Sequence, residues 1–340
     1  MDPLNTDIVI IGGGPAGVAT SLTLTARGVP HVVVEAQKQP QRKAGEALPP
    51  NAKPLLRQLG MDDLMEHPAH LPYHGNQSIW KGSPLRTEDF IKCVHGHGYL
   101  LDRLVFEQQL RKLVKAPFYT GYKLRSLSSL ENGVEVTVEN LADSLGFKAR
   151  YIVDATGRKA SVCRHLGVVP TVLDEWFGLW FYAEGKAPKQ IFVESTEQGW
   201  WYAAPFGANQ VTMMFFTRKE YIPTKAKIPA FLQKQFRQTT QLAKTFSIPD
   251  LSPAEVQIRP SGTAFLDQPY GTNWLAVGDA AYAYDPISSF GITSALAGGY
   301  YAGHALADSL EGKDDALGVY RYVMENAFQG YKEKLIKVYA

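Results

Sequence analysis

The sequence lacks the features that mark several classes of protein. It has two cysteines in 340 residues, Cys93 and Cys163, and their separation indicates neither a disulfide framework nor a Cys-x-x-Cys redox pair. No apolar run reaches the roughly 18 residues of a membrane-spanning helix. The run at 8–11 is too short for a signal peptide and ends directly in glycines. We therefore expect a cytoplasmic protein with no integral membrane segment.

An excess of charge of one sign is also absent. The 35 Lys and Arg residues nearly balance the 33 Asp and Glu residues, which leaves a formal net charge of +2. Because the basic residues are scattered, no surface for nucleic acid is indicated. We expect neither a nucleic-acid partner nor a metal site. With 45% hydrophobic and 20% charged residues, the composition is typical of a globular protein.

The first informative motif follows directly on the N-terminal apolar run. Residues 7–12, "DIVIIG", predict a buried β-strand, and "PAGVATSLTLTARG" predicts a helix that stops near Gly28. Between them stands Gly12-x-Gly14-x-x-Gly17. Gly12 permits the tight turn, Gly14 lets the backbone approach a pyrophosphate, and Gly17 allows the helix to pack closely on the strand. The pattern predicts a dinucleotide site.

Residues next to this loop agree with that prediction. Pro15 suits the first helical turn, where its missing N–H costs nothing, and Ala16 follows it in the same turn. The next predicted strand, "HVVVE", ends in Glu35, whose carboxylate can accept hydrogen bonds from both ribose hydroxyls of an adenosine. The order of strand, glycines, helix, strand and acid predicts a dinucleotide, but leaves NAD and FAD open.

A second strand and helix entrance decides between these two cofactors. The segment "NWLAVGDAA" predicts an apolar strand that ends at Gly278 and Asp279, and a long helix is predicted from Gly291. Asp279 can bind the ribityl hydroxyls of FAD. The free N–H groups of Gly291 and Ile292 can face the flavin ring. NAD has no group that needs such a remote contact, so the sequence favours FAD.

Two intermediate segments fit the same site. "DATG" at 154–157 predicts a turn in which Ala155 and Gly157 pass beside the adenosine pyrophosphate. Asp102 predicts the N-cap of a helix, and Arg103 in its first turn could reach a phosphate or the flavin edge. The alternative for Arg103 is a solvated surface charge.

Together these motifs resemble the flavoprotein monooxygenases of the p-hydroxybenzoate hydroxylase superfamily. The resemblance runs from residue 7 to about 310 and is nearest to the branch with flavin-dependent halogenases and geranylgeranyl reductases. The matching segments are Gly12 to Gly17, Glu35, "GEALPP" at 45–50, "LDRLVFEQQL" at 101–110, "DATG" at 154–157 and "GDAAYAYDPISSFGI" at 278–292.

The fold that this resemblance implies is α/β. A Rossmann-like FAD-binding domain (1–65, 99–169 and 271–340) is interrupted by a mainly antiparallel β-sheet substrate domain (66–98 and 170–270). Successive aromatic-rich segments in the insert predict strands, among them "WFGLWFYAE" and "GWWYAAPF". The tail predicts a C-terminal helix with Met324, Phe328, Tyr331, Leu335 and Val338 on one side.

The resemblance also implies a reaction. Reduced FAD and O₂ would form a C4a-hydroperoxide, which would hydroxylate an aromatic, indole- or phenol-like group of a small molecule or of a precursor protein. Pro286 matches the proline on the reactive side of the flavin. Trp200 and Trp201 are candidates for a wall over the substrate, or else strand core. "GWWYAAPF" resembles flavoproteins that mature tryptophan-derived quinone cofactors.

Several alternatives remain on the sequence alone. The chain has one dinucleotide fingerprint, so its electrons come from NAD(P)H that docks transiently or from a separate flavin reductase. An isoprenoid double-bond reductase, a flavin-dependent halogenase and a non-catalytic flavin-binding module are the other functions considered. Residues 67–80, where the halogenases place a lysine, contain none, and their Trp-x-Trp-x-Ile-Pro segment is missing. Hydroxylation is therefore favoured. The sequence identifies no general base.

Overall fold

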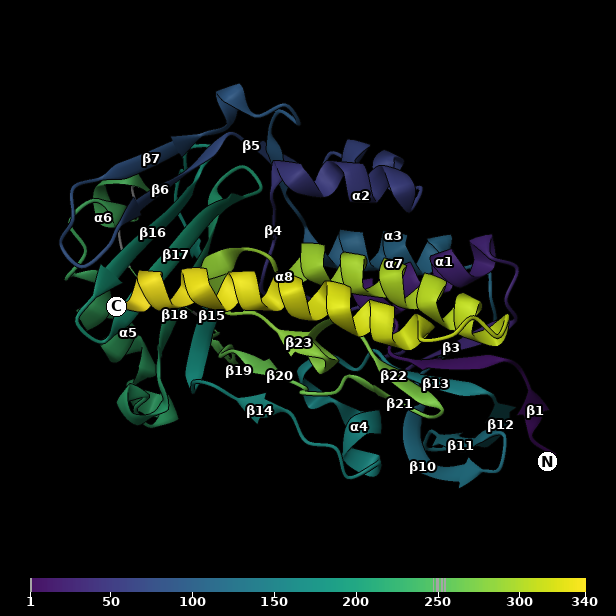
Figure 1. The fold of residues 1–340 in the computed structure, drawn as a ribbon. Helices are drawn as coiled ribbons and strands as arrows, with labels where there is room; N and C mark the ends of the chain where they lie inside the picture. The colour runs from purple at the N-terminus through teal and green to yellow at the C-terminus, as the bar shows by residue number, and fades with distance from the viewer. Residues whose placement is uncertain (1, 247, 249–250, 252, 254) are drawn as a thin grey trace.

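The computed structural model describes residues 2–340, except residues 247, 249–250, 252 and 254. Two large sheets lie at opposite ends of the molecule, and long helices run between them (Figure 1). One sheet has six strands and is mainly parallel; the other has seven strands and is mainly antiparallel. This is the mixed α/β architecture that the sequence predicts.

The six-stranded sheet contains both strands of the first motif. Its order is β21-β22-β13-β2-β3-β9, and only β21 runs antiparallel to its neighbour. The central strands are continuous apolar runs because both faces of the sheet are covered. The bounds are β2 (Ile8–Ile11), β3 (His31–Glu35), β9 (Phe118–Thr120), β13 (Tyr151–Asp154), β21 (Tyr270–Gly271) and β22 (Trp274–Ala276).

Helices cover one face of this sheet, and a four-stranded sheet with α4 covers the other. Small residues let two of the helices pack closely: a Cβ at Gly299 would lie 2.3 Å from the Ala16 carbonyl oxygen. The helices are α1 (Pro15–Ala26), α3 (Arg103–Leu113), α4 (Ser161–His165) and α7 (Gly291–Leu310). The four strands are β1 (Leu4–Asn5), β10 (Lys123–Leu130), β11 (Gly133–Glu139) and β12 (Ser144–Ala149).

The seven-stranded sheet, in the order β19-β15-β18-β17-β16-β6-β7, divides its aromatic residues between two faces. One face packs on α5 (Ile228–Phe236) and α6 (Leu242–Thr245), and the other faces the six-stranded sheet. The strands are β6 (Gly75–Ile79), β7 (Arg86–Asp89), β15 (Trp176–Glu184), β16 (Ile191–Thr196), β17 (Gly199–Phe206), β18 (Gln210–Arg218) and β19 (Gln257–Pro260).

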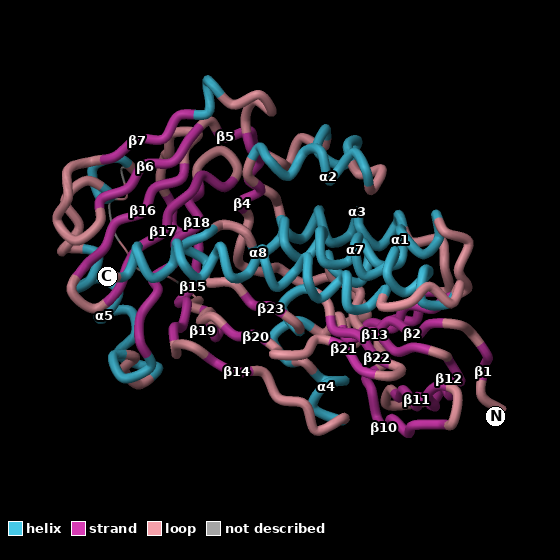
Figure 2. Tube along the Cα trace, in the orientation of Figure 1, coloured by secondary structure: helices cyan, strands magenta, loops and turns pink. Residues whose placement is uncertain are grey.

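The C-terminal helix α8 (Ala316–Tyr339) connects the two regions. It starts against α7 and ends beside the seven-stranded sheet (Figures 1 and 2). Among the described residues, no helix combines the length and apolar character needed to cross a membrane. The other elements are α2 (Lys53–Gln58), β4 (Ala47–Leu48), β5 (Leu71–Tyr73), β8 (Gly98–Leu100), β14 (Thr171–Val172), β20 (Ala264–Phe265) and β23 (Tyr282–Ala283), with eight short 3₁₀ turns among the described residues.

Candidate active site

The three glycines of the first motif have different surroundings. Gly12 has φ +117°, and a Cβ there would lie 2.1 Å from the Ala155 carbonyl oxygen. A Cβ at Gly17 would lie 1.9 Å from the Gly12 carbonyl oxygen, so this glycine lets α1 approach β2. At Gly14, by contrast, no atom lies within 4 Å of the Cβ position. The loop is thus packed at its two ends and open at Gly14, where a phosphate can approach.

The N-terminus of α1 offers donors beside that open position. Pro15 is its first residue, and the first hydrogen bond of the helix runs from Val18 N–H to the Gly14 carbonyl, at 2.9 Å. The N–H groups of Ala16 and Gly17 therefore have no acceptor within the helix. Such groups, together with the helix dipole, favour an anion such as a pyrophosphate.

Glu35 is fixed at the edge of the same loop. Its Oε2 accepts from Gly13 N–H at 2.8 Å, and its Oε1 accepts from Gln37 N–H at 2.8 Å. The nearest nitrogen of Arg111 lies 4.0 Å from Oε1. A carboxylate oxygen has two lone pairs, so each oxygen keeps one for a ribose hydroxyl. This geometry suits the role that the sequence assigns to Glu35, which stays a prediction.

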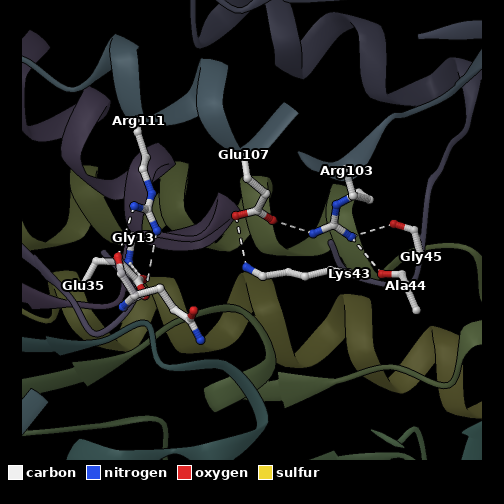
Figure 3. Close-up of polar contacts among 9 residues, drawn as sticks. Gly13, Glu35, Lys43, Ala44, Gly45, Arg103, Glu107 and Arg111 are labelled. Carbon is white, nitrogen blue, oxygen red and sulfur yellow. Dashed lines mark hydrogen bonds and ion pairs between the residues drawn. The ribbon is translucent and has the colours of Figure 1, made fainter. Parts of the chain in front are cut away.

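Helix α3 presents a row of charged side chains toward this site (Figure 3). The Asp102 carboxylate caps the helix by accepting from Leu104 and Val105 N–H, as predicted. Arg103 then donates to the Gly45 carbonyl at 2.6 Å and to Glu107 at 2.6 Å. The cap and these bonds fix the arginine at the start of the helix. Its Nε is buried without a partner, and its contact with FAD remains a prediction.

Glu107 is a buried acid that the sequence reading missed. Burial alone would raise the pKa of Glu107, but its ion pairs with Arg103 and Lys43 outweigh burial and lower the pKa. Glu107 follows Arg103 by four residues, and Arg111 follows by four more, so all three lie on one side of α3 (Figure 3). This i, i+4 spacing is the signal that could have identified the row.

The second half of the predicted site lies directly against the first. A Cβ at Gly278 would lie 2.8 Å from the Ala16 Cβ, so the loop after β22 touches the start of α1. The Asp279 side chain is 33% exposed, and its Oδ2 lies 3.4 Å from Arg158 Nε. Desolvation raises the pKa of Asp279, and the charges of Arg158 and Arg103 oppose that rise. The carboxylate is thus available to ribityl hydroxyls, the role predicted for it.

Arg158 joins the two halves of the molecule. Besides Asp279, it donates to the carbonyls of Tyr284 at 2.7 Å and Ser261 at 3.3 Å, and to that of Gly262. It follows Gly157, which has φ +66° and no atom within 4 Å of its Cβ position. The turn after β13 therefore combines an open glycine with an arginine that the sequence reading did not single out.

The N-terminus of α7 faces the same region. Its first hydrogen bond runs from Ser294 N–H to the Phe290 carbonyl at 2.8 Å, so the N–H groups of Gly291 and Ile292 have no acceptor within the helix. The Thr293 hydroxyl is buried without a partner. These donors suit the flavin edge, as predicted. Pro286 starts the short 3₁₀ turn just before them, capped by Asp285.

Trp200 and Trp201 lie on opposite faces of β17, because neighbouring residues of a strand alternate. Trp200 stacks on Phe216 at 4.0 Å between ring centroids, on the face toward the six-stranded sheet. Trp201 packs against Phe215 and Phe236 on the other face. The structure therefore brings only Trp200 to the side on which Pro286 lies.

Tyr339 of α8 connects Trp200 to the Pro286 turn. Trp200 Nε1 donates to the Tyr339 hydroxyl at 3.0 Å, which donates to Asp285 Oδ2 at 3.0 Å. The Tyr339 ring stacks on Trp176 at 5.3 Å. Burial raises the pKa of Asp285 to about 7, and the Tyr339 hydrogen bond acts against that rise. Tyr339 lies outside the predicted helix face, which includes its neighbour Val338 instead.

A comparison with known families identifies the chain. The family model described as "FAD binding domain" matches residues 5–328. The chain belongs to this FAD-binding family. The open Gly14 position, the free helix N-termini and the available Glu35 and Asp279 carboxylates all fit FAD. The chain is an FAD-dependent oxidoreductase, and its relatives include flavin-dependent halogenases, which agrees with the resemblance to the p-hydroxybenzoate hydroxylase superfamily.

Individual relatives agree with this assignment. One relative is LodB of Marinomonas mediterranea, which is assigned provisionally as an FAD-dependent oxidoreductase. The two sequences are 25% identical in an alignment of 348 positions that covers 98% of this chain and 92% of LodB. The flavin-dependent halogenase CmlS has the same fold, with a TM-score of 0.89 and 20% identity over all of this chain and 65% of CmlS. The peptidyl tryptophan dihydroxylase QhpG gives a TM-score of 0.75 and 23% identity, over 96% of this chain and 73% of QhpG. Several further relatives are flavin-dependent halogenases.

Proposed function

We propose that this protein is an FAD-dependent monooxygenase that hydroxylates an indole- or phenol-like group of a small molecule or a protein-held precursor. The observation that carries the proposal is the layer of aromatic side chains between the Pro286 turn and the seven-stranded sheet. Such side chains bind an aromatic ring by stacking and hold its polar atom by hydrogen bonds. The fold shared with QhpG supports a tryptophan-like substrate.

Each part of the chain has a separate task in this proposal. Bound FAD, once reduced, supplies an electrophilic oxygen from O₂. The Gly14 loop and Glu35 hold its adenosine half, while Asp279 and the start of α7 hold its flavin half. Trp200 and its aromatic neighbours exclude water and orient the substrate ring. Trp201 has no part in the proposal, because it faces α5.

Halogenation is the second candidate, because many relatives are halogenases. Two observations count against it. Residues 67–80 contain no lysine. Lys81, which follows Trp80, donates its Nζ to the carbonyls of Tyr339 and Ala340, both at 2.8 Å, and is exposed. This ammonium group is therefore engaged at the end of α8 and does not lie free in the aromatic layer.

Mass spectrometry of the product distinguishes the two reactions. The holoenzyme is incubated with NADH and a flavin reductase, ¹⁸O₂, chloride and bromide, and with N-acetyl-L-tryptophanamide or p-cresol as substrate. We expect a product that carries ¹⁸O and no halogen, since a monooxygenase transfers one atom of O₂. A halogenated product without ¹⁸O would show instead that the protein is a halogenase.

A further inference from the structure

Four buried polar atoms without hydrogen-bond partners lie around the junction of the "GEALPP" segment and the seven-stranded sheet. They are Glu46 Oε1, Arg103 Nε, Trp180 Nε1 and Tyr202 OH. The residues Glu46, Trp180 and Tyr202 are only 4%, 5% and 7% exposed. A buried polar group without a partner costs folding free energy. Several such groups in one place indicate a site where a bound molecule supplies the partners.

Backbone contacts hold Glu46 at this junction from both sides. Its carbonyl accepts from Leu101 N–H at 2.9 Å, and Arg103 donates to the carbonyls of Ala44 and Gly45 just before it. The next residue, Ala47, packs into the aromatic layer. The Tyr202 hydroxyl faces the Glu46 carboxyl and opposes the rise of its pKa, but Glu46 Oε1 has no partner at hydrogen-bonding geometry.

Trp180 and Tyr202 belong to one row of the seven-stranded sheet. Both pair with Met214, Trp180 from β15 and Tyr202 from β17, so their side chains lie on the same face. Their backbones are two strand spacings apart, about 10 Å. An indole N–H or a tyrosine hydroxyl can donate, whereas an ionised carboxylate can only accept. A ligand with an N–H or O–H group would supply a donor to Glu46 Oε1, which has no partner.

The electrostatic surroundings leave Glu46 able to accept a proton. Burial raises the pKa of Glu46 to about 7, and the charge of Arg103 limits the rise. Both protonation states are therefore populated near neutral pH. Three titratable or charged groups interact with Glu46 itself: Arg103 of α3, and Tyr182 and Tyr202 of the seven-stranded sheet. Three more act on these tyrosines: Tyr73 of β5 on Tyr202, and Asp102 and Arg42 on Tyr182, over which Arg42 lies.

We propose that Glu46, with Tyr202 facing it, is the polar end of the substrate site and binds the ring N–H or O–H of the aromatic substrate. The Glu46 carboxylate accepts the hydrogen bond and can take the proton, which leaves the electron pair on the substrate and makes its ring more nucleophilic. No electron is transferred in this step. The proposal rests on the proposed function. Because the aromatic layer on the seven-stranded sheet is packed, the substrate ring enters only as the side chains of this layer move apart.

Ligand binding to the oxidised holoenzyme tests this role without turnover. The probes are two pairs that differ by one methyl group: N-acetyl-L-tryptophanamide with its 1-methylindole derivative, and p-cresol with 4-methylanisole. Binding is followed by the change in flavin absorbance. We expect the probe with the free N–H or O–H to bind at least about tenfold more tightly, as in sites built around a buried polar group. In Glu46→Leu the preference should fall below about threefold.

A second variant covers the case in which Glu46→Leu loses FAD. Near pH 7, donation from the probe to Glu46 favours the carboxylate, so binding to the native protein should release protons. Calorimetry in two buffers of different ionisation enthalpy measures this release, which should vanish in Glu46→Gln. Glu131→Gln, which removes a charge from the exposed turn between β10 and β11, is the control and should behave like the native protein.

Three results would overturn the role of Glu46. They are equal or undetectable binding of the paired probes to the native holoenzyme, a preference that survives in Glu46→Leu, and proton release that persists in Glu46→Gln. The proposed function fails separately, because its test measures ¹⁸O in the product. A hydroxylating enzyme that binds both probes of a pair equally would refute only the role of Glu46.

Discussion

Gly14 and Gly17 stand three residues apart in one loop, but a larger side chain would have different effects at the two positions. A Cβ at Gly17 would lie 1.9 Å from a backbone oxygen, whereas nothing lies within 4 Å of the Cβ position at Gly14. The backbone of Gly14, with φ −81°, is open to any residue. The fold thus does not need the empty space at Gly14, and we assign that space to the cofactor.

We therefore expect Gly14→Val to fold but to lose FAD. Its side chain would occupy the space through which the backbone approaches the pyrophosphate. Affinity should fall by about 100-fold or more, which is about 2.7 kcal/mol. Flavin absorbance after gel filtration and thermal unfolding of the apoprotein measure the two properties. Gly17→Val should instead lower the stability of the apoprotein, and full FAD content in Gly14→Val would contradict the assignment of the loop.

Residues of the site differ in how far the sequence could predict them. Gly12, Glu35 and the Asp102 cap were predictable, because each follows from a local order of strand, turn and helix. Strand alternation also places Trp200 and Trp201 on opposite faces of β17. The sequence prediction treated the two residues alike, as candidates for one wall over the substrate. The lack of a partner for Glu46 depends on side chains distant in the sequence, and no local pattern encodes it.

At the scale of elements, α8 joins regions that are far apart in the chain. Near its start, the Tyr320 hydroxyl donates to the Ala276 carbonyl of β22, and Tyr331 accepts from Asp285 N–H. At its end, Tyr339 contacts Trp176 and Trp200. The sequence predicted this helix and its buried residues Met324, Phe328 and Tyr331. It could not predict where the helix ends in space, because that depends on how the two sheets pack.

Tyr339→Phe should destabilise the protein by about 1–3 kcal/mol, because it leaves Trp200 Nε1 and Asp285 Oδ2 without the Tyr339 hydroxyl as partner. The effect should depend on pH. The pKa of Asp285 rises from 3.8 to about 7 on folding, so its contribution makes stability fall as the pH rises between these values. The lost hydrogen bond had lowered this pKa, so the variant extends the fall to higher pH.

Urea unfolding at about pH 5 and about pH 8 measures this pH dependence, and we expect the larger loss of stability at the higher pH. Tyr322→Phe is the matched control, because Tyr322 lies on the same helix and is 71% exposed. It should change stability by less than about 0.5 kcal/mol at either pH. A loss in Tyr339→Phe that is equal at both pH values would show that Asp285 does not titrate in this range.

At the scale of the whole molecule, two strand-to-helix junctions meet in one place. The loop after β22 touches α1 at Ala16, and the start of α1 packs against α7 near Ala295 and Gly299. The junctions are some 260 residues apart in the sequence, which is why the second one reads as a separate motif. Their contact fits the prediction that both junctions bind one FAD.

This arrangement predicts that NADH or NADPH alone reduces the bound FAD slowly. The sequence has one dinucleotide fingerprint, which we assign to FAD, so we expect no built site from which a nicotinamide could transfer hydride. Anaerobic stopped-flow absorbance should show a rate constant below about 1 s⁻¹, the low end of typical enzyme turnover. The rate should rise linearly with NAD(P)H concentration, because no complex forms.

Dithionite, or a separate flavin reductase supplied with NADH, should reduce the flavin fully and serves as the control. Fast reduction that saturates with NADH or NADPH would demonstrate a nicotinamide site on this chain and would remove the need for a second protein.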